Sequence, residues 1–222
     1  MLSSTAAPYV CPFLVFLAFL AAAPHLSALP PRLLLGVWPA AVALSLWIFS
    51  RPLLKFKPVR PLASVGVGIA VFLLWIAPDT LIPAWRQHWL FQNSLTGGIS
   101  LSLSPQVYSD TLALWLRSLR AVLIVPIVEE LFWRGWMMRW IIKPHFTEIP
   151  LGTYTPPSFW IVAVLFALEH GPFWDVGLVA GAVYNGWMVR TKSLPDLILA
   201  HAVTNACLCL LVVLTGRWEY WL

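Results

Sequence analysis

Charged residues are scarce in this sequence. Only 10% of the 222 residues are Asp, Glu, Lys or Arg, whereas a soluble domain contains about 25%. Hydrophobic residues make up 60% of the chain, and the mean hydropathy is +0.81. This composition leaves no room for a separate soluble domain and predicts a helical membrane protein in contact with the lipid bilayer. The net charge of +5 then reports membrane topology, and we expect no nucleic-acid partner.

Cysteine and aspartate are also too few, or wrongly placed, for several kinds of site. The three cysteines give no disulfide framework, and no HExxH zinc motif is present. Every aspartate falls in a predicted loop or at the end of a predicted span, which excludes an aspartyl pair inside the membrane. These residues are Cys11, Cys207 and Cys209, and Asp79, Asp110, Asp175 and Asp196.

Long apolar runs are abundant, and they predict the fold class. We expect an all-α, polytopic bundle of about seven transmembrane spans. The first run resembles a signal peptide, but residues 1–9 contain no Lys or Arg, so we expect an uncleaved helix. The predicted spans are 10–23, 33–50, 62–77, 111–143, 159–170, 174–189 and 194–215. The last begins with a Ser193 cap and an early proline.

The distribution of cations predicts the orientation of the bundle. Arg51, Lys55, Lys57 and Arg60 fall within ten residues of one connection, which we therefore place in the cytoplasm. Seven spans then put the N-terminus inside, with eight cations in the inside connections and five outside. We expect a multi-pass protein of the cell membrane, that is, the plasma or inner membrane.

The polar segment 79–110 divides the chain. Within it, Pro83 to Gln92 mixes aromatic residues with Arg and His, which predicts a helix lying on the membrane surface. We assign residues 1–110 to an N-terminal group of spans with this polar loop. Residues 111–222 form a second transmembrane unit, which carries most of the polar groups inside the membrane.

The run from Val122 to Lys143 carries three ionisable side chains in an apolar helix. Each costs about 2.5–3.5 kcal/mol at the centre of a membrane helix. Glu130 and Arg134 lie one turn apart and can pair, whereas Glu129 points about 140° away from Arg134 and needs a partner elsewhere. Pro126 removes a backbone hydrogen bond and predicts a bend.

Further polar groups lie in the last three predicted spans. A lone His is commonly structural, and a lone Asn commonly joins helices, but leaving each one alone in lipid is costly. We therefore predict that Glu129, His170, His201 and Asn205 converge in one cavity. Glu169 is expected to have an interfacial or supporting role. Near Asn185, three glycines predict the close approach of another helix: Gly177, Gly181 and Gly186.

Carboxylate and imidazole together suit the activation of water. Glu129 can take a proton from water, and His170 can share that task. His201 and Asn205 are four residues apart on one helix face and can donate hydrogen bonds to a developing oxyanion. The alternative is a zinc ion held by His170, His201 and a glutamate, since two His and one Glu form a known catalytic zinc set.

Three ordered motifs carry a family resemblance: EExxxR at Glu129, Glu130 and Arg134, FxxxH at Phe166 and His170, and HxxxN at His201 and Asn205. Together they resemble the CAAX-protease and bacteriocin-processing family of intramembrane proteases, whose eukaryotic member is the Ras-converting CAAX prenyl protease. The resemblance covers roughly residues 112–213. The chain also looks similar to the subgroup associated with exosortase and surface-polysaccharide loci.

The resemblance implies an intramembrane endopeptidase that cleaves membrane-associated peptides or proteins and needs no cofactor. Carried over by position, Glu129 and His170 activate water, while His201 and Asn205 form the oxyanion site. The remaining motif residues support the site: Glu130, Arg134 and Phe166. Residues 111–222 would then be the catalytic core.

Two other functions remain open for the same residues. Some relatives are thought to act without catalysis, as bacteriocin-immunity or assembly proteins. A transporter with a Glu/His proton relay is the other alternative, and the lack of an internal repeat weighs against it. Asn205 beside His201 favours the protease, because an oxyanion site uses both side chains and a relay needs no amide.

Overall fold

The computed structural model describes residues 5–26, 29–94, 96–98 and 105–221. Every named element in this part of the chain is helical, and the only β-type pairing described is an isolated bridge between Asn93 and Gly97. The predicted all-α bundle is confirmed.

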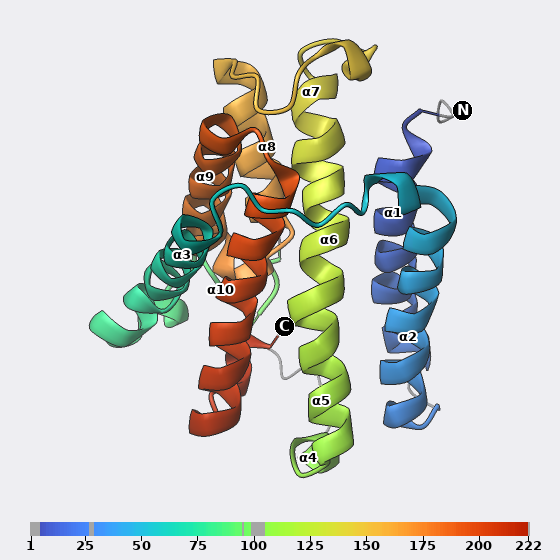
Figure 1. Ribbon diagram of the computed structural model, residues 1–222. Coiled ribbons are helices and arrows are strands. Elements are labelled where there is room, and N and C mark those ends of the chain that lie inside the picture. The colour runs from blue at the N-terminus through green and yellow to red at the C-terminus, as the bar shows by residue number, and fades with distance from the viewer. Residues whose placement is uncertain (1–4, 27–28, 95, 99–104, 222) are drawn as a thin grey trace.

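The bundle is arranged around one central helix (Figure 1). Two helices lie on one side of it, α1 (Ala7–Ala22) and α2 (Pro31–Ser45). Four helices lie on the other side: α3 (Pro61–Leu81), α8 (Pro156–Leu168), α9 (Trp174–Thr191) and α10 (Leu194–Thr215). A one-turn helix, α4 (Pro105–Tyr108), precedes the central helix.

The central helix runs without a break from Thr111 to Trp140. It alternates α-helical and π-helical stretches: α5 (Thr111–Leu119), a π turn (Arg120–Ile124), α6 (Val125–Glu130), a second π stretch (Leu131–Met137) and α7 (Met138–Trp140). The prediction of one long helix starting near Thr111 is confirmed. Pro126, which was predicted to bend it, is the second residue after the first π turn.

Asp110 caps the start of the central helix. Its Oδ1 accepts hydrogen bonds from the backbone N–H groups of Leu112 (3.1 Å) and Ala113 (3.2 Å), which satisfies donors that a helix start leaves free. A hydrogen bond from Arg32 lowers the pKa of the Asp110 carboxyl. The cap therefore stays ionised at neutral pH, where an anion at a helix N-terminus is favourable.

The count of spans differs from the sequence prediction. In the described part of the chain, five helical segments are long and apolar enough to cross a membrane. These segments are Ala7–Leu26, Pro31–Leu53, Pro61–Leu81, Thr111–Trp140 and Leu194–Thr215. The fifth predicted span is the shorter apolar helix α8, and the sixth, α9, is not among the candidates. The protein is nevertheless a multi-pass membrane protein, as predicted.

The start of α10 is fixed by a buried carboxylate. Asp196 is fully buried and accepts hydrogen bonds from the backbone N–H groups of Val59 and Arg60, both at 2.6 Å. Ser64 and the predicted cap residue Ser193 donate their hydroxyls to the same carboxylate. This network attaches the connection before α3 to the start of α10 and holds the two helices side by side.

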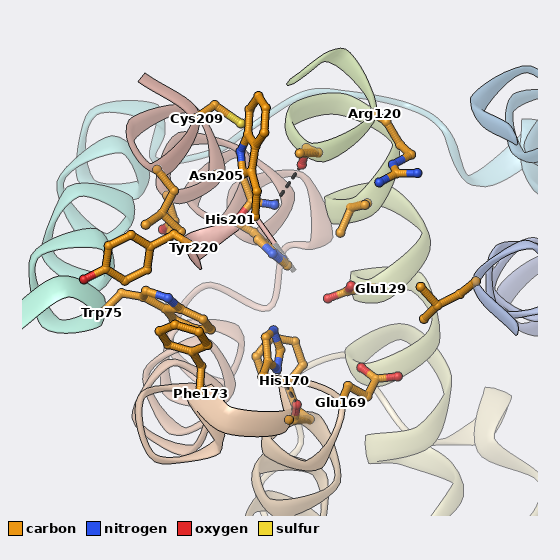
Figure 2. A pocket seen from close by; sticks show the side chains of 18 of the residues that line it. Trp75, Arg120, Glu129, Glu169, His170, Phe173, His201, Asn205, Cys209 and Tyr220 are labelled. Atoms are coloured by element: carbon orange, nitrogen blue, oxygen red, sulfur yellow. Dashed lines mark hydrogen bonds between the residues drawn. The ribbon is translucent and has the colours of Figure 1, made fainter. Parts of the chain in front are cut away.

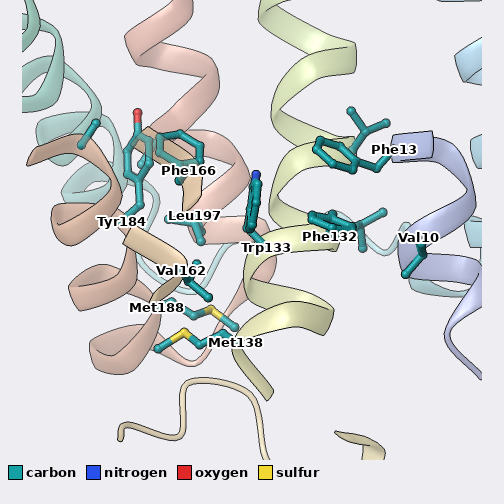
Figure 3. Close-up of a cluster of buried hydrophobic side chains, with 14 of the residues drawn as sticks. Val10, Phe13, Phe132, Trp133, Met138, Val162, Phe166, Tyr184, Met188 and Leu197 are labelled. Atoms are coloured by element: carbon teal, nitrogen blue, oxygen red, sulfur yellow. The ribbon is translucent and has the colours of Figure 1, made fainter. Parts of the chain in front are cut away.

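A continuous apolar core joins the central helix to both sides (Figure 3). On one side, Phe13 of α1 stacks on Phe132, with ring centroids 4.1 Å apart. On the other side, Trp133 meets Phe166 of α8 edge to face. Helices α8 and α9 approach closely at two of the three predicted glycines, because a Cβ at Gly177 or Gly181 would lie 3.1–3.3 Å from α8 or from His170 just beyond its end. Gly186 has no neighbour within 4 Å, so its predicted role is wrong.

The predicted surface helix over residues 83–92 is also wrong. This segment contains one 3-10 turn, Trp85–Gln87, and it folds onto the bundle. Arg86 is buried because it pairs with Asp79 (2.9 Å) and Asp175 and donates to the carbonyl of Pro172 (2.7 Å). Ion pairs therefore hold a segment whose aromatic residues alone suggested the membrane surface.

The closest approach of α3 to α10 gives a test of this packing. A Cβ at Gly68 would lie 2.3 Å from the carbonyl oxygen of Ala200 and 2.7 Å from the Cβ of Val203. We expect Gly68→Ala to destabilise the protein by about 1–3 kcal/mol, since overpacking forces two backbones apart. The measurement is the thermal unfolding midpoint in detergent.

Gly66 is the matched control, because it lies on the same helix with no neighbour within 4 Å. Gly66→Ala should keep or raise the midpoint, since Ala favours helix over Gly by about 1 kcal/mol. Equal midpoints for the two variants would contradict the tight α3–α10 contact.

Candidate functional site

A cavity of about 610 Å³ lies between the central helix and the helices around it. Glu129 of α6, His170 after the end of α8, and His201 and Asn205 of α10 all line it. Figure 2 shows these four side chains around one common space. The structure therefore brings together all four residues that the sequence predicted to converge.

Arg134 is the fully buried centre of the polar network behind the cavity. Its Nη1 lies 3.1 Å from both carboxylate oxygens of Glu130, as predicted from their spacing. Its Nε donates to Oδ1 of Asn185 on α9 (2.8 Å), and its Nη2 donates to the carbonyl of Gly181 (3.3 Å). Asn185 in turn donates to the carbonyl of Phe159 on α8 (2.7 Å). One guanidinium thus joins the central helix to α9 and, through Asn185, to α8.

Glu130 connects this network to the cavity. Its Oε1 lies 2.8 Å from Nδ1 of His201. A carboxylate paired with Arg134 is an acceptor, so Nδ1 of His201 carries the proton and donates. This contact fixes the imidazole ring and leaves its Nε2 for the cavity. The sequence predicted the pair between Glu130 and Arg134 but not this third member.

Phe166, the aromatic residue of the FxxxH motif, supports three charged or polar neighbours. The guanidinium of Arg134 lies 4.6 Å from its ring centroid, a cation–π distance. The rings of His170 and His201 lie 4.7 Å and 6.2 Å from it. Phe166 therefore packs against the buried guanidinium and against both histidine rings.

His170 is held by the end of its own helix. Its Nδ1 lies 2.7 Å from the carbonyl oxygen of Phe166, four residues earlier, and that carbonyl is one that a helix end leaves unpaired. Because a carbonyl only accepts, Nδ1 carries the proton, and Nε2 of the neutral ring is an acceptor. Gly171 follows with a positive φ of 49°, which turns the chain away directly after the histidine.

Glu129 differs sharply from its neighbour Glu130. Glu129 is 8% exposed as a residue, and its Oε2 is buried with no hydrogen-bond partner among the described residues. The sequence predicted that Glu129 would need a partner outside its own helix. Instead, its carboxylate points into the cavity (Figure 2), where a ligand or water can approach it.

Asn205 has a second task in addition to lining the cavity. Its Nδ2 donates a 2.7 Å hydrogen bond to the carbonyl oxygen of Ala121. Pro126 lies five residues after Ala121 and has no N–H, so it cannot supply the π-helical hydrogen bond to that carbonyl. The amide of Asn205 fills this gap, and its second N–H remains free to donate elsewhere.

The sequence missed several residues that line the cavity. Trp75 meets His170 edge to face at 5.1 Å, and Tyr184 stacks on His201 at 5.1 Å. Arg120 also lines the cavity, although its position near the outer end of the helix gave no sign of it. Glu169 lines the cavity as well and accepts a hydrogen bond from Nε1 of Trp133 (3.0 Å), in agreement with a supporting role.

Metal binding has little geometric support. Across the described ranges, no three His, Cys, Asp or Glu side chains are grouped so that they could hold a metal ion together. Nε2 of each histidine is nevertheless available to a ligand, so the zinc alternative is left to a direct test below.

Comparison with known proteins identifies one family. Residues 111–207 match a family model described as type II CAAX prenyl endopeptidase Rce1-like. No curated protein and no solved structure matches the chain significantly. The matched segment includes the central helix and all seven residues of the three motifs. This segment, which is less than half of the chain, is therefore similar to the CAAX prenyl endopeptidases.

Proposed function

We propose that this protein hydrolyses peptide bonds of membrane-associated substrates in the cell membrane by means of water activated by Glu129 and His170. The observation that carries the proposal is Oε2 of Glu129, which has no partner among the described residues and lies in the cavity that His170 also lines. A buried acceptor without a partner is costly unless something else satisfies it. A water molecule between Glu129 and His170 would do so.

Water activation uses the free acceptors on both side chains. Glu129 takes the proton as the water oxygen attacks the peptide carbonyl, and Nε2 of His170 orients the water. The proton then moves to the leaving amine as the tetrahedral intermediate collapses. The hydrogen bond from His170 to the carbonyl of Phe166 fixes the ring in the tautomer that this role requires.

His201 and Asn205 of α10 stabilise the oxyanion. Since Nδ1 of His201 already donates to Glu130, a second donation from Nε2 to the oxyanion uses the doubly protonated ring. The second N–H of Asn205 is the other donor. Glu130, Arg134 and the doubly protonated His201 then have a net positive charge next to the oxyanion. A positive charge there stabilises the negative oxygen.

A substrate can enter from the bilayer along the apolar side of the cavity. Phe16, Leu17 and Leu20 of α1 line that side. A substrate that is anchored in the membrane can therefore approach Glu129 along apolar surface. The family description suggests the first probe, a farnesylated, internally quenched peptide that ends in a CAAX box, with its unprenylated form for comparison.

Substitution of the two adjacent glutamates should have different effects on cleavage and on folding. Glu129→Gln is expected to lower kcat by at least about 10²–10⁴, the usual contribution of a general base, and to leave the unfolding midpoint near that of the wild type. Glu130→Gln should instead lower the yield of folded protein, because it leaves the buried Arg134 without its carboxylate. Fluorescence-detected size exclusion and peptide cleavage measure the two effects. Equal loss of folded protein in both variants would show that Glu129 is structural as well.

Asn205 should contribute to the rate and, more modestly, to stability. We expect Asn205→Ala to lower kcat by about 10²–10³, the usual cost of one oxyanion donor. The midpoint should also fall, since the Ala121 carbonyl loses its partner at a cost of about 1–3 kcal/mol. A variant with unchanged kcat and a raised KM would contradict the donor role and leave Asn205 as a structural residue.

Metal removal decides between the glutamate and zinc mechanisms. We expect purified protein to retain cleavage after exhaustive chelation and to contain no stoichiometric metal by elemental analysis. One zinc per chain, lost together with activity in His201→Ala but retained in Asn205→Ala, would overturn the glutamate mechanism, since an amide is not among the usual zinc ligands.

A further inference from the structure

A second set of unsatisfied groups lies in the same cavity, away from the water-activating pair. Arg120 is 8% exposed, and its Nη1 is buried with no hydrogen-bond partner among the described residues. Trp38 is 5% exposed, and its Nε1 is also buried without a described partner. The guanidinium of Arg120 lies 3.9 Å from the ring centroid of Trp38. Two unpaired N–H donors, one of them charged, are therefore adjacent and line the cavity.

The π turn of Arg120–Ile124 explains how Arg120 reaches the side of the helix that carries Glu129. In an uninterrupted α-helix, residues nine apart lie about 180° from each other. The π turn absorbs one extra residue, so the remaining eight steps leave the two side chains about 80° apart. Arg120 and Glu129 consequently line one cavity, as Figure 2 shows.

The charges divide the cavity into a positive and a negative end. Arg117 at the end of α5 and Arg120 at the start of the π turn line the positive end, and Arg117 donates to the carbonyl of Trp221 (2.7 Å). Glu129 of α6 and Glu169 at the end of α8 line the negative end. A buried guanidinium without a counterion is expensive, which indicates that an anionic ligand completes the positive end. A carboxylate matches the planar fork of arginine.

We propose that Arg120, with Nε1 of Trp38, binds a carboxylate of the peptide substrate and thereby sets the direction in which the peptide lies across Glu129. The proposal deepens the proposed function and rests on it. A substrate is favoured over a lipid phosphate as the source of the anion because the donors share one cavity with the water-activating residues. Repulsion from Glu129 and Glu169 would drive a substrate carboxylate towards the arginine end, so the peptide binds in one orientation.

The carboxylate comes from an acidic side chain or from the C-terminus of the peptide, and three probes separate these sources. The first is a farnesylated CAAX-box peptide with a free C-terminus and no acidic residue. The second is the same peptide with a C-terminal amide. The third is that amide with one aspartate added. Binding is measured by fluorescence titration to Glu129→Gln protein in detergent, so that no cleavage interferes.

At least one carboxylate probe should bind about 10–100-fold more tightly than the neutral amide, as expected for a hydrogen bond to a charged group. Arg120→Met should abolish that preference, and Arg120→Lys should restore only part of it, because lysine lacks the fork. Trp38→Phe keeps the ring but loses the N–H donor, and should reduce the preference. Arg190→Gln removes a charge from an exposed site away from the cavity and should leave the preference unchanged.

The unfolding temperature of Arg120→Met shows whether Arg120 binds the substrate or supports the fold. Arg120→Met should unfold at or above the wild-type temperature, since it removes a buried unpaired charge and retains contact with Trp38. A lower midpoint with an unchanged carboxylate preference would overturn the proposal. The same conclusion would follow if neither carboxylate probe bound better than the amide. It would also follow if phosphatidylglycerol, rather than the peptides, stabilised the wild type and not Arg120→Met.

The outcomes also distinguish this proposal from the proposed function. A carboxylate preference in Glu129→Gln protein, together with no cleavage by the wild type, would support the Arg120 subsite and refute the peptidase function. Efficient cleavage of the acid and amide peptides at the same kcat/KM by wild type and Arg120→Met would leave the peptidase in place and overturn the subsite.

Discussion

The buried charge of Arg134 is the constraint on which the site depends. A guanidinium with no exposed surface inside a membrane helix needs a counterion and several acceptors. It finds them in Glu130, in Asn185 and in the carbonyl of Gly181. Because Glu130 also holds His201, the residues that neutralise one charge position the ring that faces the cavity. The histidine of α10 is thus placed by a charge on the central helix.

Much of this network could be predicted from spacing alone. The high cost of ionised groups in lipid means that Glu130 and Arg134, one turn apart, have to pair. The same arithmetic separates Glu129 from that pair, and the structure leaves its Oε2 without a described partner. The FxxxH spacing places His170 next to the carbonyl of Phe166, a local contact that depends only on helix geometry.

Other parts could not be predicted, because they depend on departures from α-helical geometry or on distant segments. The π turn at Arg120–Ile124 shifts the faces of the helix, so a constant angle per residue misplaces Arg120. The bond from Asn205 to Ala121 arises because Pro126 lacks an N–H and α10 happens to lie alongside. Burial of Arg86 requires Asp79 and also Asp175, and nothing in the sequence near residue 86 indicates the distant Asp175.

Three residues with a buried side-chain atom that lacks a partner among the described residues line one cavity: Trp38, Arg120 and Glu129. Another such atom, Nη2 of Arg86, lies outside that cavity, in the connection after α3. Deep in the polar network, the charged groups of Arg134 and Glu130 and the amide of Asn185 have partners. By contrast, Glu129 and Arg120 line the cavity with buried atoms that lack described partners. A membrane bundle tolerates such groups only where a ligand completes them, since lipid offers no hydrogen bonds. Their position at the two ends of one cavity is therefore the physical basis for assigning water to one end and a substrate carboxylate to the other.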